Sequence, residues 1–171
     1  ALEFDEDELK TLKECCDGVQ NTPRSVKRLV NVFKLLKIIW HRKTLTVKPA
    51  IKRAMGLLLA LCARYPEAMR RLLVDLEEAV RRNSTTEAMQ EYLSNRTDFW
   101  KKNAREISGW DEIGYTVREG GLLKQGLRLS EFGGENLDLV GCFSFVGEDL
   151  VMADEDAGPP PNGGTGSLPA S

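Results

Sequence analysis

The 171-residue sequence is poor in the residues and motifs on which enzyme active sites depend. It contains one histidine, His41, and four cysteines whose spacing matches neither a zinc site nor a small disulfide framework. No G-x-x-x-x-G-K-[ST] phosphate loop is present, because the glycines and the lysine of residues 120–126 stand in the wrong order. The acidic pairs Glu77-Glu78 and Asp111-Glu112 are adjacent, so on a helix they diverge by about 100°. We therefore predict no catalytic residue and no metal ligand, and whether the chain is an enzyme stays open.

Long apolar runs are missing as well. The longest, residues 55–63, is far shorter than the roughly 20 residues that span a bilayer, and no secretory signal leads the chain. The thiols of Cys15, Cys16, Cys62 and Cys142 are expected to be free and buried, as in a reducing compartment. These features predict a cytoplasmic protein with no membrane segment in this chain.

Acidic residues are absent from a long part of the sequence. Between Gly18 and Pro66 there are eleven Lys or Arg and no Asp or Glu. After Arg128 there is no further basic residue, and the segment carries eight acidic ones, namely Glu131, Glu135, Asp138, Glu148, Asp149, Asp154, Glu155 and Asp156. Such asymmetry predicts either an anionic partner for the basic part or attraction between the two parts.

The basic part contains a well-specified helix, expected from Pro23 to about His41. Thr22 supplies a capping oxygen, and Pro23 suits the first helical position, where an N–H group is not needed. Arg24, Lys27 and Arg28 follow at spacings of three and four, so they project together. The opposite side is an apolar stripe of Val26, Leu29, Val30, Phe33, Leu36 and Trp40.

The cationic side of this helix is the candidate binding site. It has two interpretations, a merely solvated face or an anion-binding face. The positive end of the helix dipole and a guanidinium beside free N–H groups suit a phosphate. Nucleic acid is a further candidate ligand, since Arg42, Lys43, Lys48, Lys52 and Arg53 extend the charge, giving a basic surface over residues 23–53. His41 is expected to cap the helix or to be solvated.

The remaining pattern predicts a mainly α fold, a compact bundle of about five to six helices within residues 1–107. Further helices are expected at residues 3–16, 47–64, from Pro66 onward, 86–93 and 98–107. The helix at 47–64 is apolar nearly all round and should be the central one. A capping box, Ser84-Thr85-Thr86-Glu87, is expected before residues 86–93. The side chains expected to face inward are Leu9, Leu12, Cys15 or Cys16, Met69, Leu72, Leu73 and Leu76, with Phe99 and Trp100 as anchors.

Glycines punctuate the sequence from residue 108 onward. Residues 108–151 are expected to form a Gly-rich irregular or extended segment that packs on the bundle. Alternating apolar positions at residues 137–146 predict a short strand. Residues 152–171 are acidic and rich in Gly and Pro, and we expect them to form a disordered tail.

Three segments resemble the KAP-type P-loop NTPases, which are signal-transduction NTPases related to AAA+ proteins. Residues 21–31, Asn-Thr-Pro-Arg-Ser-Val-Lys-Arg-Leu-Val-Asn, resemble the family's N-x-P-R-x-[IVL]-K-R-[LF]-[VL]-N segment, which begins a helix of the lid. Residues 57–73, with Ala63-Arg64-Tyr65-Pro66-Glu67, resemble the following helix pair and its aromatic-proline break. Residues 141–147, Gly-Cys-Phe-Ser-Phe-Val-Gly, are similar to a short C-terminal motif of bacterial members.

The resemblance implies a lid or regulatory region that senses the phosphates of ATP and signals to a partner. It implies a sensor role for Arg24, with Arg28 as second choice and Lys27 as a weaker supporting charge. ATP would bind only together with an N-terminal NTPase core, which these 171 residues do not contain, and we expect the chain to be the C-terminal portion of a longer polypeptide. The alternatives are a helical protein-interaction module without nucleotide and nucleic-acid binding through residues 23–53.

Overall fold

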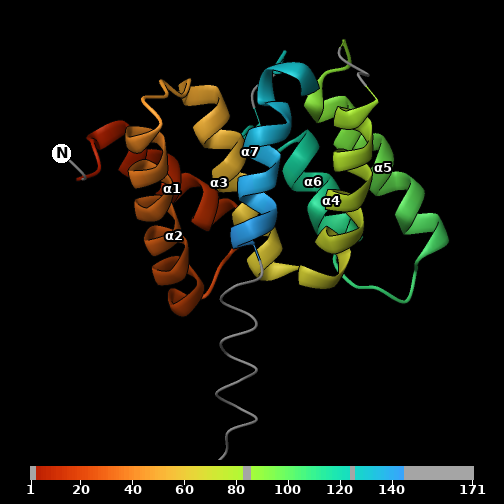
Figure 1. The fold of residues 1–171 in the computed structure, drawn as a ribbon. Coiled ribbons are helices and arrows are strands. Elements are labelled where there is room, and N and C mark those ends of the chain that lie inside the picture. The colour runs from red at the N-terminus through yellow and green to blue at the C-terminus, as the bar shows by residue number, and fades with distance from the viewer. Residues whose placement is uncertain (1–2, 83–85, 124–125, 145–171) are drawn as a thin grey trace, which may run out of the picture.

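Seven α-helices make up nearly all the regular structure of residues 3–82, 86–123 and 126–144, which the computed structural model describes. The helices are α1 (Glu6–Val19), α2 (Pro23–Arg42), α3 (Pro49–Arg64), α4 (Pro66–Arg81), α5 (Met89–Asn103), α6 (Trp110–Arg118) and α7 (Leu129–Phe143) (Figure 1). Within these ranges the only β-pairing is one antiparallel bridge between Ala88 and Arg128. The prediction of a mainly α-helical bundle is confirmed.

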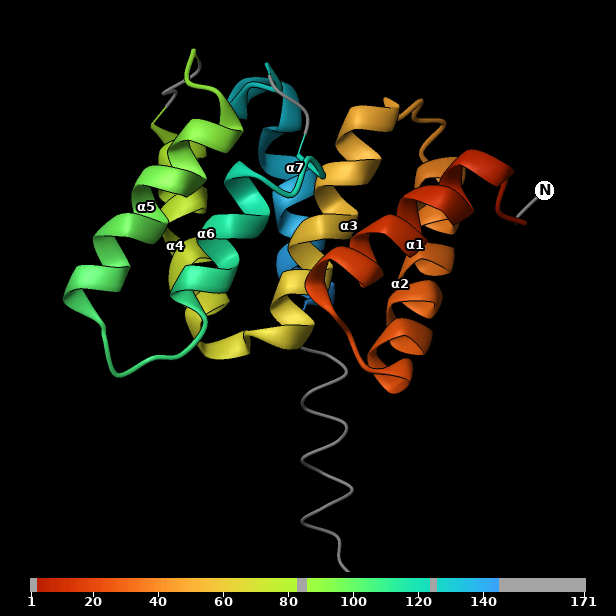
Figure 2. The ribbon, with the colours of Figure 1, turned by 180° about the vertical axis from the view of Figure 1, so that it is seen from behind.

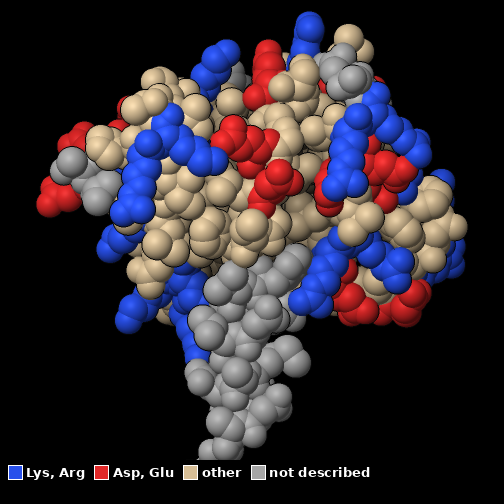
Figure 3. Space-filling view, viewed as in Figure 1, with Lys and Arg blue, Asp and Glu red and all other residues tan. Residues whose placement is uncertain are grey.

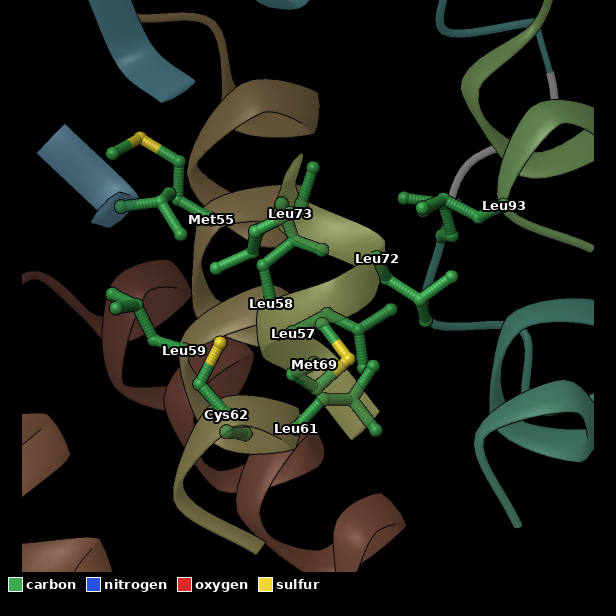
Figure 4. Close-up of a cluster of buried hydrophobic side chains, with 14 of the residues drawn as sticks. Met55, Leu57, Leu58, Leu59, Leu61, Cys62, Met69, Leu72, Leu73 and Leu93 are labelled. Carbon is green, nitrogen blue, oxygen red and sulfur yellow. The ribbon is translucent and has the colours of Figure 1, made fainter. Parts of the chain in front are cut away.

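Helix α3 is the centre of the bundle, as its apolar composition predicts. It packs against α1, α2, α4 and α7, and every residue from Ala54 to Cys62 is buried. In Figure 4 the side chains of Leu57, Leu61 and Met69 lie together between α3 and α4. Gly56 permits the closest approach, because a Cβ there would lie 3.2 Å from the Cys15 sulfur and 3.4 Å from the Phe33 ring. The core therefore fixes α1 and α2 against one side of α3.

Helices α2, α3 and α4 begin close to where the sequence predicts. Thr22 Oγ1 accepts a hydrogen bond from Ser25 N–H at 3.2 Å, and proline opens α2, α3 and α4. Helix α1 is the exception at both ends: it starts at Glu6 behind the cap of Asp5, and it ends at Val19 with Gln20 in the left-handed region. Leu9 was expected inside but is 51% exposed. Leu12 is buried as expected, and both Cys15 and Cys16 are buried.

The second half of the chain is more helical than the sequence suggests. The two short helices expected at 86–93 and 98–107 are one helix, α5, whose first residue follows Ala88 without a side-chain cap. Thr97 lies in the expected break, but it is buried and donates its hydroxyl to the Leu93 carbonyl at 2.7 Å. Ser84 and Thr85 of the expected capping box lie outside the described residues.

The prediction of an irregular segment at residues 108–151 is wrong for its described part, most of which is helical. Helices α6 and α7 add Trp110, Ile113, Phe132 and Val140 to the same buried cluster as α3, so they belong to the bundle. The expected strand at 137–146 is helix as far as Phe143, because Leu137 and Val140 are three residues apart and both face the core. Residues 145–146 and the expected tail at 152–171 lie outside the described residues.

Three of the four cysteines are buried, as predicted, and none of the four forms a disulfide. Cys142 is the correction: it is exposed, because it lies on the outer side of α7. No helix in the described ranges is both long enough and apolar enough to span a bilayer.

Candidate anion-binding face on helix α2

Helix α2 has the two-sided character that its sequence predicts. Leu29, Phe33, Leu36 and Trp40 are buried on the inner side, and the Phe33 and Trp40 rings meet edge to face at 6.4 Å. Arg24 and Lys27 are exposed, and Arg28 is half-buried. The three predicted site residues therefore lie together on the outer side of the first two turns. His41, near the end of the helix, is exposed.

The start of α2 leaves donors available to a ligand. The first N–H groups of a helix have no intrahelical acceptor, and together they carry the positive end of the helix dipole. Thr22 satisfies the N–H of Ser25, and Pro23 has none. The N–H of Arg24 has no acceptor among the described residues, so Arg24 offers a free backbone donor as well as its guanidinium.

Ion pairing separates the cations of the basic segment into two groups. Lys37 and Lys52 bind Glu8, Arg53 binds Glu14 at 2.7 Å, and Lys43 binds Glu135 at 2.8 Å. Within residues 3–82, 86–123 and 126–144, no carboxylate lies within ion-pairing distance of four other cations, which we call the basic α2 face: Arg24, Lys27, Arg28 and Lys34. Figure 3 shows Lys and Arg gathered along the side of the molecule where α2 lies.

Glu8 lies at a junction of three helices and pairs with two of the lysines of the basic segment. Its carboxylate binds Lys37 Nζ at 2.6 Å and Lys52 Nζ at 2.8 Å, and it accepts the Asp5 N–H at 3.1 Å. Lys37 and Lys52 also lie over aromatic rings, those of Phe4 and Trp40. Burial acts to raise the pKa of Glu8, but the hydrogen bonds from the two lysines and from Asp5 outweigh it and hold the pKa below the ordinary value. This junction ties α1 to α2 and α3.

The surface expected for nucleic acid is interrupted. Of the five cations that were expected to extend the charge beyond the first turns, Lys43, Lys52 and Arg53 are paired with glutamates. Only Arg42 and Lys48 of that set have no carboxylate partner in the described part of the chain. The cations without a carboxylate partner in the described residues are therefore concentrated on α2 itself.

A second polar cluster joins α4 to α5, and no pattern in the sequence predicts it. The Asp75 carboxylate accepts hydrogen bonds from Trp100 Nε1 at 2.6 Å and from Arg96 Nε at 2.9 Å, while its backbone carbonyl accepts from the Tyr92 hydroxyl. Arg71 stacks over the Trp100 ring at 4.9 Å. The partners are separated by more than fifteen residues in sequence, so no local motif could reveal the cluster. Trp100 is an anchor as predicted, whereas Phe99 is 42% exposed.

Other parts of the described surface offer weaker sites. An open hollow of about 650 Å³ lies between the end of α5 and the start of α6, but it is lined by both signs of charge, and Lys101 pairs with Asp111 across it. No group of three or more potential metal ligands is found in the described residues. The basic α2 face is therefore the strongest candidate for a binding site.

Comparisons of the chain with protein-family models, with curated proteins and with solved structures gave no match. The resemblance to KAP-type NTPases therefore stays a prediction.

Proposed function

We propose that this helical bundle is the lid and regulatory region of a KAP-type P-loop NTPase, in which Arg24 contacts the phosphates of ATP held by a separate nucleotide-binding core. One observation carries the proposal: Arg24 is exposed at a proline-initiated helix start, with a free N–H beside it and no carboxylate partner in the described residues. Lys27 and Arg28 add positive charge on the same side. A phosphate placed there would meet a dipole, an N–H group and a guanidinium together.

The lid would act as a switch through the position of α2 relative to the core. A ligand shifts an equilibrium between two orientations only by its different affinity for them. The γ-phosphate would favour the orientation that brings Arg24 into contact, and hydrolysis would remove that preference. Because α2 is fixed to α3 by buried side chains and to α1 through Glu8, the bundle would move as one body and transmit the change to a protein partner. The proposal places the chain in the cytoplasm, where its thiols stay reduced.

A nucleotide-independent protein-interaction module is the second candidate, and one observation favours it. Leu35 is 47% exposed on the outer side of α2, two turns beyond Arg28. A phosphate gains no favourable contact from Leu35, whereas an acidic peptide that also carries an apolar residue would contact both Leu35 and the cations. Nucleic acid is favoured less, because three of the cations it would need are paired with glutamates.

The phosphate proposal can be tested with the chain alone by titrating tripolyphosphate, a mimic of the ATP triphosphate, in a calorimeter at low salt. We expect Arg24→Ala to weaken binding by about threefold to tenfold, since a hydrogen bond to a charged group contributes up to about 3 kcal/mol and exposed ion pairs contribute less. The matched control is Arg105→Ala, because Arg105 is also exposed and has no carboxylate partner in the described ranges.

Equal weakening by the two substitutions would contradict the proposal, because it would mean that tripolyphosphate responds only to net charge. Tight binding of a DNA duplex that falls steeply with salt would support the nucleic-acid alternative instead. Binding of an acidic peptide that is lost in Leu35→Ser would favour the interaction module.

A further inference from the structure

The basic α2 face begins in the first turn of α2, at one end of the bundle. Helix α2 starts, and helix α7 ends, at the same end of the bundle, and the two opposite views agree on this (Figures 1 and 2). The chain beyond α7 therefore begins at the end of the bundle where Arg24, Lys27 and Arg28 lie. Its residues 145–171 are outside the described part of the structure.

The sequence beyond α7 carries charge opposite to that of the basic α2 face. Residues 148–156, Glu-Asp-Leu-Val-Met-Ala-Asp-Glu-Asp, hold five carboxylates, and no Lys or Arg follows Arg128 anywhere in the chain. These carboxylates have no neighbour in sequence that neutralises them. The four cations of the basic α2 face likewise have no carboxylate partner in the described residues.

The acidic segment is long enough to lie along the basic face. At about 3.3–3.6 Å per residue, position 148 can lie up to about 14 Å from the end of the described chain at position 144, and position 156 up to about 43 Å. The part of α2 from Arg24 to Lys34 rises only about 15 Å, at 1.5 Å per residue. The apolar run Leu150-Val151-Met152 between the carboxylates has a counterpart in Leu35, which is 47% exposed and follows Lys34 at the far end of the basic α2 face.

We infer that residues 148–156 of this chain bind the basic α2 face and compete there with other anions. The occupant is the chain's own acidic segment, because it has the complementary charge, a matching apolar element and a length that exceeds that of the face. Bound in this way, the segment would lower the affinity of the face for any phosphate or acidic partner until that partner displaces it. The inference needs only the charges of α2, so it does not depend on the assignment of a nucleotide.

The test uses the full chain labelled with ¹⁵N, in which the five carboxylates of residues 148–156 are replaced by amides. The substitutions are Glu148→Gln, Asp149→Asn, Asp154→Asn, Glu155→Gln and Asp156→Asn. A control variant of equal net charge loses five exposed carboxylates elsewhere, by Glu67→Gln, Glu91→Gln, Glu106→Gln, Glu112→Gln and Glu119→Gln. Spectra are recorded at about 0.01 M salt, where the screening length is about 30 Å, and at about 1 M salt, where it is about 3 Å.

We expect the backbone amide signals of residues 24–35 to move in the first variant and not in the control. High salt should move the same signals of the native chain in the same direction. Unchanged signals on α2 would overturn the inference, and so would signals that move on another surface instead, such as that around Arg70 and Arg71 of α4.

Titration with tripolyphosphate gives a second readout. If the acidic segment occupies the face about nine-tenths of the time, its neutralisation should tighten tripolyphosphate binding about tenfold, since apparent affinity scales with the free fraction of the site. Movement of the α2 signals without tripolyphosphate binding in any variant would refute the proposed function and leave this inference standing. Binding at α2 that is equally tight in native and neutralised chains would refute the inference and leave the proposed function standing.

Discussion

Replacing Glu8 by glutamine removes one negative charge from the junction that ties α1 to α2 and α3. The Glu8 side chain is only 7% exposed, and it holds Lys37 at 2.6 Å and Lys52 at 2.8 Å. The amide keeps the size of the carboxylate, so packing is preserved and the change is mainly electrostatic. The variant therefore isolates what the ionised carboxylate contributes to stability.

The expected loss is about 2–3 kcal/mol in the free energy of unfolding. A hydrogen bond to a charged group contributes about 1.5–3 kcal/mol, and Glu8 makes one to each lysine. Breaking a fully buried ion pair costs about 3–5 kcal/mol. Here the Lys37 and Lys52 side chains are 16% and 26% exposed, so water compensates them in part and the cost falls below that range.

The pH dependence gives an independent check on the same group. Hydrogen bonds from the lysines and from Asp5 outweigh the opposing effect of burial, so the pKa of Glu8 in the folded state lies below the ordinary value of 4.5. The stabilisation is then fully present above pH 4.5 and is lost as the pH falls through the folded-state pKa. We expect the difference in stability between native chain and Glu8→Gln to shrink below that pH.

The assay is urea unfolding followed by circular dichroism at several pH values. Glu78→Gln serves as the control, because Glu78 pairs with Arg82 on the exposed side of α4 and such pairs contribute about 0.5 kcal/mol or less. A loss in Glu8→Gln no larger than that of the control would refute the reasoning. A difference that stays constant down to pH 3 would show that the effect is one of packing and not of charge.

Three other outcomes follow from the structure. With a thiol reagent under native conditions, Cys142 should react at once, while the three buried thiols react only as the chain unfolds. Gly109→Ala should lower the free energy of unfolding by about 1–3 kcal/mol in thermal melts, because Gly109 has φ +105° and a Cβ there would lie 2.5 Å from the Tyr65 ring. The control is Gly141→Ala, which lies in an open helical position and should be neutral or stabilising. Trp100→Phe should cost about 1.5 kcal/mol in urea unfolding by removing the hydrogen bond to Asp75.

The sequence predicted the first half of the fold well because local signals there agree with the packing. Proline opens three helices in succession, and Thr22 caps the one that carries the candidate site. The inner side of α2 and the all-apolar character of α3 also follow from periodicity alone. The cationic cluster of Arg24, Lys27 and Arg28 could be placed for the same reason, since positions three and four apart share one side of a helix.

The second half was mispredicted because its local signals oppose the packing. Glycines suggest breaks, yet Gly114 lies inside α6 and Gly141 inside α7, where buried neighbours keep the chain helical. Gly133 has φ 74° and marks a kink within α7, not an end. The pairing of Glu8 with Lys37 and Lys52 joins residues distant in sequence, so the division between paired and unpaired cations was visible only in the structure.

The proposed function requires the outer side of α2 to be a specific anion site, and a residue-resolved titration tests this directly. Tripolyphosphate is added to the ¹⁵N-labelled full chain at low salt, and the amide signal of every assigned residue is followed. We predict that the largest changes fall on Arg24 to Arg28 and saturate together, and that Arg24→Ala reduces them. Equal small changes at all exposed Lys and Arg residues, or a maximum around Lys101 to Arg105, would contradict it.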